Sequence, residues 1–574
     1  MENIKKLQMT GGEALAKMLG VYETKIMFGI GGFQLLPFYD AISRQGNRNP
    51  RHILVNDERS GAYAADAYAR VLGRPGVCDG TMGPGATNLT NGLIEAHGAG
   101  IPMVAVIGDS NRDHSFKNMT QETLQKEVLS PIVKEFIMVE RGHRIPELTR
   151  RAFLTATSGR PGPVVLSVPE NVAHGMWDFN EDEFHVHPNS LNIPAFRIRP
   201  DSEIVQKAAA LISRSDRPVL LVGGGIHLSG AYRELSEFAE SLNIPVAHTL
   251  SGKGCLAGSH PLCIHLFGRY DRFANELIRE SDLLIGLGFK FGEIATSRYS
   301  LIPSHIPVIH IDISPEEIGK HQTIEVGMWA DCKLALKDLL DEMSESLPTQ
   351  KQKRKEYAGQ ILKMQEQWRE ANRARLFSEE NPLTMSRVCT ELSRAIPADG
   401  ILLADGGFAA HWTGLLYDTS GAGRTYIANR GNASIGYGIP GGMGAQLAAG
   451  QIPVVAITGD GGCNMSLGDL ETIIRENIPV TVLVVNNAAS GYVKALQHSM
   501  FKRYQSSDLL DMNYAEIFKS MGGRGVRVET PEALEGALRD GIAEKAAPVL
   551  IDMVTTRDPD FMLPAADART RKKN

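Results

Sequence analysis

The sequence predicts an α/β fold built from parallel β-sheets, and two patterns in its 574 residues lead to that prediction. Short runs rich in Val, Ile and Leu recur along the chain, and each is almost continuously apolar rather than alternating. Such runs are typical of parallel strands that helices cover on both faces. Amphipathic segments such as 59–73 and 466–477 lie between the runs and are expected to form helices.

Nine apolar runs are expected to be strands, and they fall into three groups along the chain. Each group contains runs that end in glycine turns, and ligands of open parallel sheets bind at the carboxyl ends of strands. The expected strands are 101–108, 163–169, 218–225, 282–288, 308–313, 401–407, 453–462, 480–487 and 548–554.

Two stretches interrupt this rhythm and predict domain boundaries. Residues 186–202 contain three prolines and little periodicity, and residues 343–381 are charged and helical in character. The sequence therefore predicts three α/β domains, each with a doubly wound parallel sheet, at 1–185, 200–345 and 380–574.

Composition and charge exclude several classes of protein. The chain is 43% hydrophobic and 22% charged, which is typical of a globular protein and not of a disordered or fibrous one. A formal net charge of −6 argues against nucleic acid as the main partner. No run reaches the ~18 consecutive apolar residues of a membrane span. The six cysteines show no CxxC pair and no metal-ligand spacing, and the amino-terminal segment lacks the apolar stretch of a signal peptide. We therefore expect a cytoplasmic protein with no membrane association, and the basic tail 569–574 is expected to be a mobile end rather than a binding site.

The strongest local signal lies in residues 459–491. An apolar run ends at Asp460 between glycines, a helix is expected to follow, and the next run ends in paired asparagines, the second of which is Asn487. The 24 residues from 462 to 485 accommodate one helix and one strand, so Asp460 and Asn487 are expected at the ends of adjacent strands. A carboxylate and an amide oxygen there suit a hard cation such as Mg²⁺, and glycine amides at a helix N-terminus bind phosphate oxygens. A helix cap and a strand turn would explain each residue singly, but not the agreement of strand, spacing and order.

This arrangement resembles the signature of thiamine diphosphate (ThDP) enzymes, in which a GDG turn is followed by paired asparagines. Residues 56–96 and 160–172 resemble the pyrimidine domain of the acetolactate synthase branch, and residues 217–321 resemble its central domain. The resemblance implies a pyrimidine-binding, a central Rossmann-like and a diphosphate-binding domain, with ThDP and Mg²⁺ as cofactors. The cofactor-binding residues that it implies are Glu58, Gly407, Ala433, Ile435, Gly459, Asp460, Gly461, Gly462, Asn487, Ala489 and Gly491. The metal ligands that it implies are Asp460, Asn487 and Ala489.

The resemblance also implies roles for Glu58 and for two residues of the segment 429–445. In the family, the glutamate at the place of Glu58 donates to N1′ of the aminopyrimidine ring. The cofactor's C2 proton is too weakly acidic for solvent to remove, so a proton-transferring group must be held within bonding reach. Ile435 falls at the place of the bulky side chain beneath the bent cofactor, and the carbonyl of Ala433 at the place that holds the 4′-amino group.

Further side chains are candidates for contact with the substrate. Gln121, in the run MTQE, matches the family's active-site glutamine, and a neutral amide suits a site that handles oxyanions. Lys134 aligns with a lysine of the same branch, which suggests a role in the site. The alternative is that Lys134 is a solvated surface lysine without such a role. Phe33 and Gln34 stand where acetolactate synthases keep small residues, so Gln34 is a candidate catalytic residue, with capping of the next helix as the alternative. Leu496 takes the place of a tryptophan that shapes the acceptor pocket, so a preference for 2-ketobutyrate does not carry over.

The central domain leaves the binding of FAD open. Residues 223–225 and Asp312 match the places where FAD-binding members of the family approach the dinucleotide. The branch's RFDDR run is replaced, however, with Lys290 for the arginine and Gly292 and Glu293 for the acids. Two readings remain at this point: the domain binds FAD, or it packs without flavin as in many members of the family.

The resemblance implies an acetolactate synthase-like carboligase that decarboxylates a 2-oxo acid, pyruvate by default, and joins the remaining fragment to a second carbonyl compound. Its cofactor sites would form between the pyrimidine domain of one subunit and the diphosphate domain of another, as a homodimer or homotetramer. Phe33, Gln34 and Leu496 keep a 2-oxo acid decarboxylase, an aldehyde lyase or a pyruvate oxidase open as alternatives. A non-catalytic ThDP-binding paralogue is a further alternative, against which the retention of Glu58 and Asp460 argues.

Overall fold

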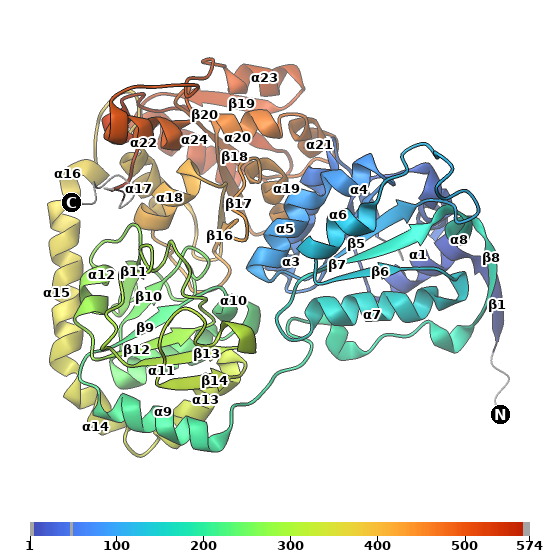
Figure 1. The fold of residues 1–574 in the computed structure, drawn as a ribbon. Helices are drawn as coiled ribbons and strands as arrows, with labels where there is room; N and C mark the ends of the chain where they lie inside the picture. The colour runs from blue at the N-terminus through green and yellow to red at the C-terminus, as the bar shows by residue number, and fades with distance from the viewer. Residues whose placement is uncertain (1–4, 46–49, 566, 568–574) are drawn as a thin grey trace. The chain divides into compact units, whose positions relative to one another are not determined.

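The fold consists of parallel sheets connected by helices (Figure 1). The computed structural model describes residues 5–45, 50–565 and 567, and in this part of the chain three six-stranded sheets are built from parallel strand pairs alone. The prediction of an α/β fold with three parallel-sheet domains is therefore confirmed. All nine apolar runs form strands.

The chain forms two compact units. Unit 1 consists of residues 1–196, 429–450 and 465–480, and unit 2 of residues 197–428, 451–464 and 481–574. The first sheet lies in unit 1 and the other two lie in unit 2. The domain boundaries expected from the sequence stay predictions.

The sheet of unit 1 has the strand order β3-β2-β4-β5-β7-β6. Its strands are β2 (Ile26–Ile30), β3 (Arg51–Leu54), β4 (Gly76–Gly80), β5 (Met103–Asp109), β6 (Glu135–Met138) and β7 (Pro163–Pro169). A separate antiparallel pair joins β1 (Lys6–Thr10) to β8 (Met176–Asn180). The helices of unit 1 are α1 (Gly11–Val21), α2 (Leu36–Gln45), α3 (Glu58–Leu72), α4 (Pro84–Asn88), α5 (Thr90–Ala99), α6 (Gln125–Leu129), α7 (Ile145–Thr157), α8 (Glu170–His174), α19 (Gly438–Ala449) and α21 (Asp469–Arg475). Helix α7 lies on one face of the sheet, and α3 and α5 lie on the other (Figure 1).

Helix α3 carries Glu58 at its first position. Asp57 precedes the helix and its side chain accepts a hydrogen bond from a backbone amide of the first turn, while Gly73, with φ 71°, ends the helix in the left-handed region. Gly444 allows α19 to come close to α3, since a Cβ there would lie only 2.0 Å from the carbonyl oxygen of Ala64. The backbone that carries Glu58 is therefore fixed by a cap at its start and by a close helix–helix contact along its length.

Both faces of the second sheet, which has the order β11-β10-β9-β12-β13-β14, are buried. Leu220 and Val222 belong to one apolar cluster, and Val219 and Leu221 belong to another, because successive side chains of a strand point to opposite faces. This burial explains why the sequence shows continuous apolar runs here. The strands are β9 (Pro218–Val222), β10 (Val246–His248), β11 (Cys263–Leu266), β12 (Leu283–Leu287), β13 (Val308–Asp312) and β14 (Val326–Trp329).

The third sheet has the order β16-β15-β17-β18-β20-β19 and carries the predicted diphosphate site. Its strands are β15 (Ile401–Ala404), β16 (Tyr426–Ala428), β17 (Val454–Gly459), β18 (Thr481–Asn486), β19 (Arg524–Val528) and β20 (Val549–Val554). The helices of residues 197–574 outside unit 1 are α9 (Ser202–Arg214), α10 (Gly225–Ser229), α11 (Tyr232–Leu242), α12 (Ala274–Arg279), α13 (Cys332–Glu342), α14 (Leu347–Lys353), α15 (Lys355–Ala371), α16 (Arg373–Leu376), α17 (Met385–Ala395), α18 (Phe408–Leu416), α20 (Asp460–Met465), α22 (Gly491–Phe501), α23 (Tyr514–Ser520) and α24 (Pro531–Ala543).

Two expectations about the whole chain bear on its environment. In the described part of the chain, no helix is both long and apolar enough to cross a bilayer. The six cysteines, all of them described, are free and buried. The expected tail 569–574 lies outside the described residues.

Candidate cofactor and active site

The candidate diphosphate site lies at the carboxyl ends of two adjacent strands of unit 2. Strands β17 and β18 pair in parallel, with Gly459 opposite Val485. The site begins directly after the last residue of each strand. Asp460 is the first residue of α20, and Asn487 follows the end of β18. The sequence prediction that these two residues follow neighbouring strands is therefore confirmed.

Asp460 is a buried carboxylate held by backbone amides. Its Oδ1 accepts a hydrogen bond from the amide of Gly461 at 2.8 Å, and its Oδ2 accepts one from the amide of Ala489 at 3.2 Å. Only 2% of Asp460 and 3% of Asn487 are exposed. Burial raises the pKa of Asp460 to about 6, against which the amide hydrogen bonds act. A bound cation would favour the ionised form, so this oxygen-rich group fits a hard divalent cation such as Mg²⁺.

The two asparagines that follow β18 have different surroundings. The side chain of Asn486 points into the fold, where its amide nitrogen donates to the carboxylate of Asp552 at 3.0 Å and to the carbonyl of Met512 at 2.8 Å. The side chain of Asn487 lies beside Gly491, since a Cβ on that glycine would come within 2.6 Å of its Nδ2. Asn486 therefore stabilises the strand end, and Asn487 is left as the candidate ligand.

The candidate glycines combine close packing with open space. A Cβ on Gly462 would lie 2.3 Å from the carboxylate of Asp405, so no larger residue fits there. By contrast, a Cβ on Gly459 would have no heavy atom within 4 Å, and one on Gly461 would meet only Leu509 at 3.7 Å. Gly407, which precedes α18, has φ 69° and ψ −121°, a conformation that favours glycine. The space beside the backbone amides of Gly459 and Gly461 can accommodate a phosphate group, whose oxygens accept hydrogen bonds from such amides.

Glu58 lies in unit 1, where a neighbouring amide holds it. The side chain is 6% exposed, and its Oε2 accepts a hydrogen bond from Nδ2 of Asn88 at 3.0 Å. Asn88 is the last residue of α4 and was not among the residues predicted from the sequence. This hydrogen bond fixes Oε2 of Glu58. Because a carboxylate is planar, it also sets the direction in which Oε1 points.

The turn 81–85 contacts all three residues predicted to be catalytic. A Cβ on Gly85 would lie 2.9 Å from Oε1 of Glu58, and one on Gly83 would lie 2.2 Å from the carbonyl oxygen of Gln121. Thr81 Oγ1 donates to Oε1 of Gln34 at 3.0 Å. The structure thus brings Glu58, Gln34 and Gln121 around one short turn.

The two glutamines differ in exposure. Gln34, in the short 3-10 turn η1 (Phe33–Leu35), is 6% exposed, and its side-chain oxygen is already engaged by a threonine hydroxyl. Gln121 is exposed and has φ 67°, in the left-handed region. Phe33, beside Gln34, is 58% exposed. Gln34 is thus a fixed group and Gln121 an accessible one.

Ala433 and Ile435 belong to a loop of unit 1 that runs into α19. Ala433 has φ 58°, and its amide donates to Oε2 of Glu95 at 3.1 Å. Ile435 is 41% exposed although most aliphatic side chains of the chain are buried. An accessible aliphatic side chain on a fixed loop suits contact with an apolar part of a ligand.

Two flavin candidates of the central domain, Gly223 and Gly225, pack closely against Gly288. A Cβ on Gly223 would lie 2.1 Å from the carbonyl oxygen of Gly288, and the amide of Gly225 donates to that oxygen at 3.2 Å. Glu293 forms an ion pair with Arg269 at 3.1 Å. Gly224 and Gly292 are more open, since a Cβ on Gly224 would meet only Ser251, at 3.4 Å, and one on Gly292 would have no heavy atom within 4 Å. The binding of FAD therefore stays a prediction.

Lys134 has a structural explanation that the sequence did not reveal, whereas Leu496 does not. Lys134 donates from Nζ to the carbonyls of Thr155 and Ser158 at 2.6 and 2.5 Å, which satisfies the C-terminal end of α7. Leu496 is half-buried in α22. The lysine is therefore part of the fold, and the leucine stays a candidate for the acceptor side.

Three buried residues of types that often bind metals lie close together, although the spacing of the cysteines along the chain did not indicate them. The side-chain ligand atoms of His248, Cys263 and His265 lie within 4.8 Å of one another. Burial lowers the pKa of both histidines well below the usual value, and the nearby cations Lys253 and Arg272 lower it further. A divalent cation would add to this positive charge, so we assign no metal to the group.

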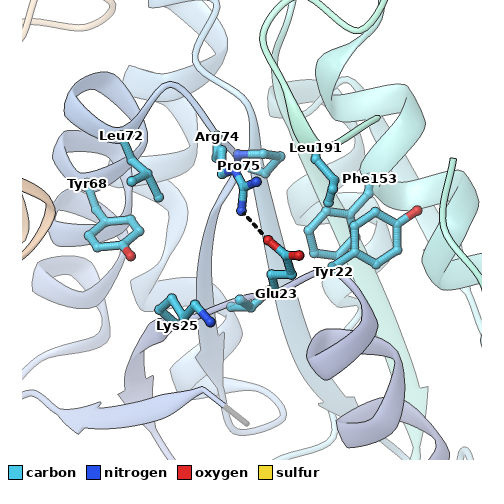
Figure 2. Close-up of a pocket in the computed structure, with 10 residues that line it drawn as sticks. Tyr22, Glu23, Lys25, Tyr68, Leu72, Arg74, Pro75, Phe153 and Leu191 are labelled. Carbon is cyan, nitrogen blue, oxygen red and sulfur yellow. Dashed lines mark hydrogen bonds and ion pairs between the residues drawn. The ribbon is translucent and has the colours of Figure 1, made fainter. Parts of the chain in front are cut away.

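A small pocket in unit 1 lies apart from the predicted site residues, none of which lines it (Figure 2). Tyr22 stacks on Phe153 at 3.9 Å between ring centroids, and Arg74 forms an ion pair with Glu23 at 3.1 Å. We therefore give this pocket no role in the site.

Comparison with known proteins agrees with the three-domain α/β fold. Residues 9–128 match the thiamine pyrophosphate enzyme N-terminal TPP binding domain, residues 205–339 the central domain, and residues 405–553 the C-terminal TPP binding domain. The chain belongs to the thiamine pyrophosphate enzyme family, thiamine pyrophosphate being another name for ThDP.

Full-length relatives place the chain in the acetolactate synthase-like branch of this family. It is 33% identical to the probable acetolactate synthase large subunit of Methanococcus aeolicus, over 93% of this chain and 90% of that protein. It is 32% identical to the probable acetolactate synthase large subunit of Methanocaldococcus jannaschii, over 99% of this chain and 95% of that protein. It is 31% identical to the acetolactate synthase of Mycobacterium bovis, over 96% of this chain and 89% of that protein.

Proposed function

We propose that this protein is a ThDP- and Mg²⁺-dependent carboligase that decarboxylates a 2-oxo acid, pyruvate by default, and transfers the remaining acyl fragment to a second carbonyl compound. The observation that carries the proposal is full-length similarity to acetolactate synthase large subunits in a chain that keeps Glu58, Asp460 and Asn487. The buried, amide-held carboxylates at both predicted cofactor positions support it.

The diphosphate end of the cofactor would be held by unit 2. The carboxylate of Asp460, the side-chain oxygen of Asn487 and the carbonyl of Ala489 would bind Mg²⁺, which neutralises the diphosphate. The space at Gly459 and Gly461 would receive phosphate oxygens on backbone amides. These groups bind and orient the cofactor, and take no part in proton transfer.

Proton transfer would depend on Glu58. When bound, ThDP supplies an acidic carbon that adds to a carbonyl group, and an electron sink for the charge left when CO₂ departs. Glu58 would hold a proton at N1′ of the pyrimidine ring with one oxygen, while Asn88 holds the other. The Ala433 carbonyl would accept a hydrogen bond from the 4′-amino group, and Ile435 would support the bent cofactor with its exposed apolar surface.

The substrate side would be lined by Gln34 and Gln121. Gln34 is buried, and the hydrogen bond from Thr81 to its side-chain oxygen fixes the orientation of the amide group. Its amide nitrogen would then donate a hydrogen bond to an oxyanion. Gln121 is exposed and would contact substrate from an accessible segment. Phe33 and Leu496 would shape the pocket for donor and acceptor.

Subunits would assemble as a homodimer or homotetramer with cofactor sites shared between chains. The exposed apolar side chains of unit 1, including Phe33, Phe116 and Leu124 at 58%, 86% and 61% exposure, support an assembly that covers apolar surface. FAD is not part of this proposal.

The experiment that tests the function is a product analysis. The purified protein is incubated with ThDP, Mg²⁺, pyruvate and a panel of 2-oxo acids and aldehydes, and the products are identified by mass spectrometry. Release of CO₂ with formation of a 2-hydroxy-2-methyl-3-oxo acid such as acetolactate supports the carboligase. The Glu58→Gln variant, which keeps the shape of the side chain, should still bind ThDP and Mg²⁺ but form no product.

A second candidate is a simple 2-oxo acid decarboxylase or aldehyde lyase on the same scaffold. The bulky exposed Phe33 and the fixed amide of Gln34, where the branch keeps small residues, favour it. Aldehyde release without any carboligation product from the whole panel would select this candidate. Failure of every 2-oxo acid to lose CO₂ would revive a non-catalytic ThDP-binding role.

A further inference from the structure

One buried carboxylate of unit 1 binds three consecutive backbone amides of the loop that carries Ala433 and Ile435. Glu95, on α5, accepts hydrogen bonds from the amide of Gly431 at 2.8 Å, of Asn432 at 2.6 Å and of Ala433 at 3.1 Å. Its side chain is fully buried. Three converging amide donors are a strong anion-binding arrangement, since each bond to an ionised acceptor is stronger than a neutral one.

Arg70 links this carboxylate to a second one on α3. Its Nη2 donates to Oε1 of Glu95 at 2.9 Å, and its Nε donates to Oδ2 of Asp66 at 2.7 Å. The hydroxyl of Tyr437 donates to the same Asp66 oxygen at 2.7 Å. All four side chains are buried, and burial raises the pKa of Asp66. One guanidinium cannot neutralise two buried carboxylates, so the loop amides complete the electrostatic balance of Glu95.

The same loop is anchored again beyond Ala433. The Tyr63 hydroxyl lies 2.7 Å from Oγ of Ser434, and the Asn429 side chain donates to the Ser434 carbonyl at 2.5 Å. A Cβ on Gly431 would lie 1.9 Å from the backbone oxygen of Glu95, so the loop reaches the carboxylate only with glycine there. The loop is thus fixed from below, while the side chain of Ile435 stays exposed.

We propose that Glu95, paired with Arg70, is a positioning residue for the cofactor: it fixes the loop 431–435 in the conformation that presents the Ala433 carbonyl and the Ile435 side chain to ThDP. This inference rests on the proposed function for the roles of Ala433 and Ile435. Glu95 itself touches no cofactor atom. Its effect is preorganisation, because a loop that is already ordered loses little conformational entropy when the ligand binds.

The test compares the full-length wild type, Glu95→Gln and Glu95→Asp without and with ThDP and Mg²⁺. Glutamine keeps the shape but offers only one acceptor oxygen, and aspartate keeps the charge but is one methylene too short to reach all three amides. In the cofactor-free protein, we expect the amides of 431–433 to exchange with deuterium roughly tenfold faster in Glu95→Gln, because a hydrogen bond to a buried charge is lost. Glu95→Asp should fall between this variant and the wild type.

The second readout is ThDP affinity in the presence of Mg²⁺, measured by calorimetry. We expect it to fall by roughly tenfold in Glu95→Gln, since binding must then order the loop. The matched control is Glu391→Gln in unit 2, where Glu391 is 2% exposed and accepts from Arg387 at 2.8 Å. This control also removes a buried charge, and it should leave both the loop exchange and the ThDP affinity unchanged.

The outcomes separate this inference from the proposed function. Faster loop exchange together with weaker ThDP binding in both Glu95 variants supports it. Unchanged loop exchange, or faster exchange with unchanged ThDP affinity, overturns it while the proposed function stands. If the wild type binds no ThDP, the proposed function fails, and the exchange data still report whether Glu95 holds the loop.

Discussion

The side chain of Asn88 carries the most direct prediction at the scale of single residues. Its Nδ2 donates to Oε2 of Glu58 at 3.0 Å, so it orients the carboxyl group that would transfer a proton. In Asn88→Ala, this oxygen loses its donor and the carboxyl group is free to rotate. We expect exchange of the C2 proton of bound ThDP, followed by NMR, to slow by roughly tenfold, the worth of one hydrogen bond to a charged group.

The control for this prediction removes a similar hydrogen bond elsewhere. Asn180 donates from Nδ2 to a carboxylate oxygen of Glu183 at 3.3 Å, in a turn after β8. Asn180→Ala should exchange the C2 proton at the wild-type rate. Equal rates for Asn88→Ala and the wild type would refute a role of Asn88 in orienting Glu58.

Asp460 gives a prediction on the metal. Asp460→Asn keeps the shape of the side chain but removes the only charge among the three proposed ligands. Mg²⁺ affinity in the presence of ThDP should fall by at least roughly tenfold, because hard cations bind through carboxylate charge. Titration calorimetry measures this. The control Asp331→Asn removes a buried carboxylate that accepts from Arg197 at 2.7 Å at the start of α13, and it should leave the Mg²⁺ affinity unchanged. An equal loss in both variants would contradict the assignment.

The sequence allowed the prediction of chemical groups, but not of the partners that hold them. Glu58 and Asp460 stand in local patterns with a recognisable spacing. Asn88 lies 30 positions from Glu58, and Glu95 lies more than 330 positions from the loop that it binds. Since such contacts depend on how strands and helices are brought together, residue types along the chain contain no direct sign of them. Glu95 in particular reads as an ordinary polar position of a helix.

At the scale of elements, Lys253 is a buried cation between the second and third sheets of unit 2. It is 2% exposed and donates from Nζ to the carbonyl of Gly414 near the end of α18 at 3.1 Å. Burial lowers its pKa to about 8; Asp418 opposes this change and Arg272 adds to it. The ammonium group therefore destabilises the folded state until it loses its proton.

The sign of the pH dependence follows from this lowered pKa. Between about pH 8 and the unfolded value of about 10.4, the unfolded chain binds more protons at Lys253 than the folded chain does, so this residue's contribution to stability increases with pH. Conversely, the contribution is lost as the pH falls from about 10.4 to about 8, and it does not change further below that. A difference of about 2.5 pKa units corresponds to about 3 kcal/mol.

Lys253→Met should therefore raise the urea midpoint of unfolding at pH 7 and abolish most of the gain that the wild type shows between pH 8 and 10. Urea titrations of both proteins at several pH values measure the difference. Lys363→Met, at an exposed position of α15, serves as the control and should follow the wild type. A wild-type pH profile retained in Lys253→Met would contradict the buried-cation argument.

The nine strands that were predicted are buried almost throughout. β9 and β12, for example, are fully buried and read as continuous apolar runs. The edge strands β3 and β14 expose three and two of their four residues at least partly, and no apolar run marks them. β4 was missed although it is wholly buried, because it contains two glycines and Asp79.

Asp79 shows why a polar residue can lie inside a sheet without a signal in the sequence. Its carboxylate accepts from the hydroxyl of Tyr39 at 2.6 Å and lies 2.8 Å from the ring nitrogen of His52. Both partners come from other elements, so the burial of the charge is compensated only in the folded chain. Strand prediction from apolarity fails at such positions for that reason.

At the scale of the whole molecule, the two compact units are not continuous stretches of the sequence. The segments 429–450 and 465–480 belong to unit 1 although they lie in the last third of the chain. The first contains α19, whose glycines allow close contact with α3. A helix without a polar face gives no indication of its packing partner. The periodicity of the sequence therefore could not predict that these two segments of the last third pack with the first third.

The proposed sharing of cofactor sites between subunits leads to a complementation prediction. Assayed at a Mg²⁺ concentration too low to fill the weakened site of Asp460→Asn, Glu58→Gln and Asp460→Asn chains are each expected to be inactive, the first in proton transfer and the second in metal binding. If each site takes Glu58 from one chain and Asp460 from another, a pair made of one variant of each kind contains one complete site and one doubly altered site. Two different affinity tags allow such mixed pairs to be purified after co-expression.

Mixed pairs should regain about half of the wild-type activity per pair, because a symmetric dimer has two equivalent sites and one of them is restored. Pairs of Glu58→Gln with itself and of Asp460→Asn with itself, purified with the same two tags, control for residual activity and should form no product. If both groups came from one chain, every site of a mixed pair would lack one of them, and the mixed pairs would be as inactive as the controls. A monomer in light scattering would exclude shared sites at once, since the partner chain would then be missing.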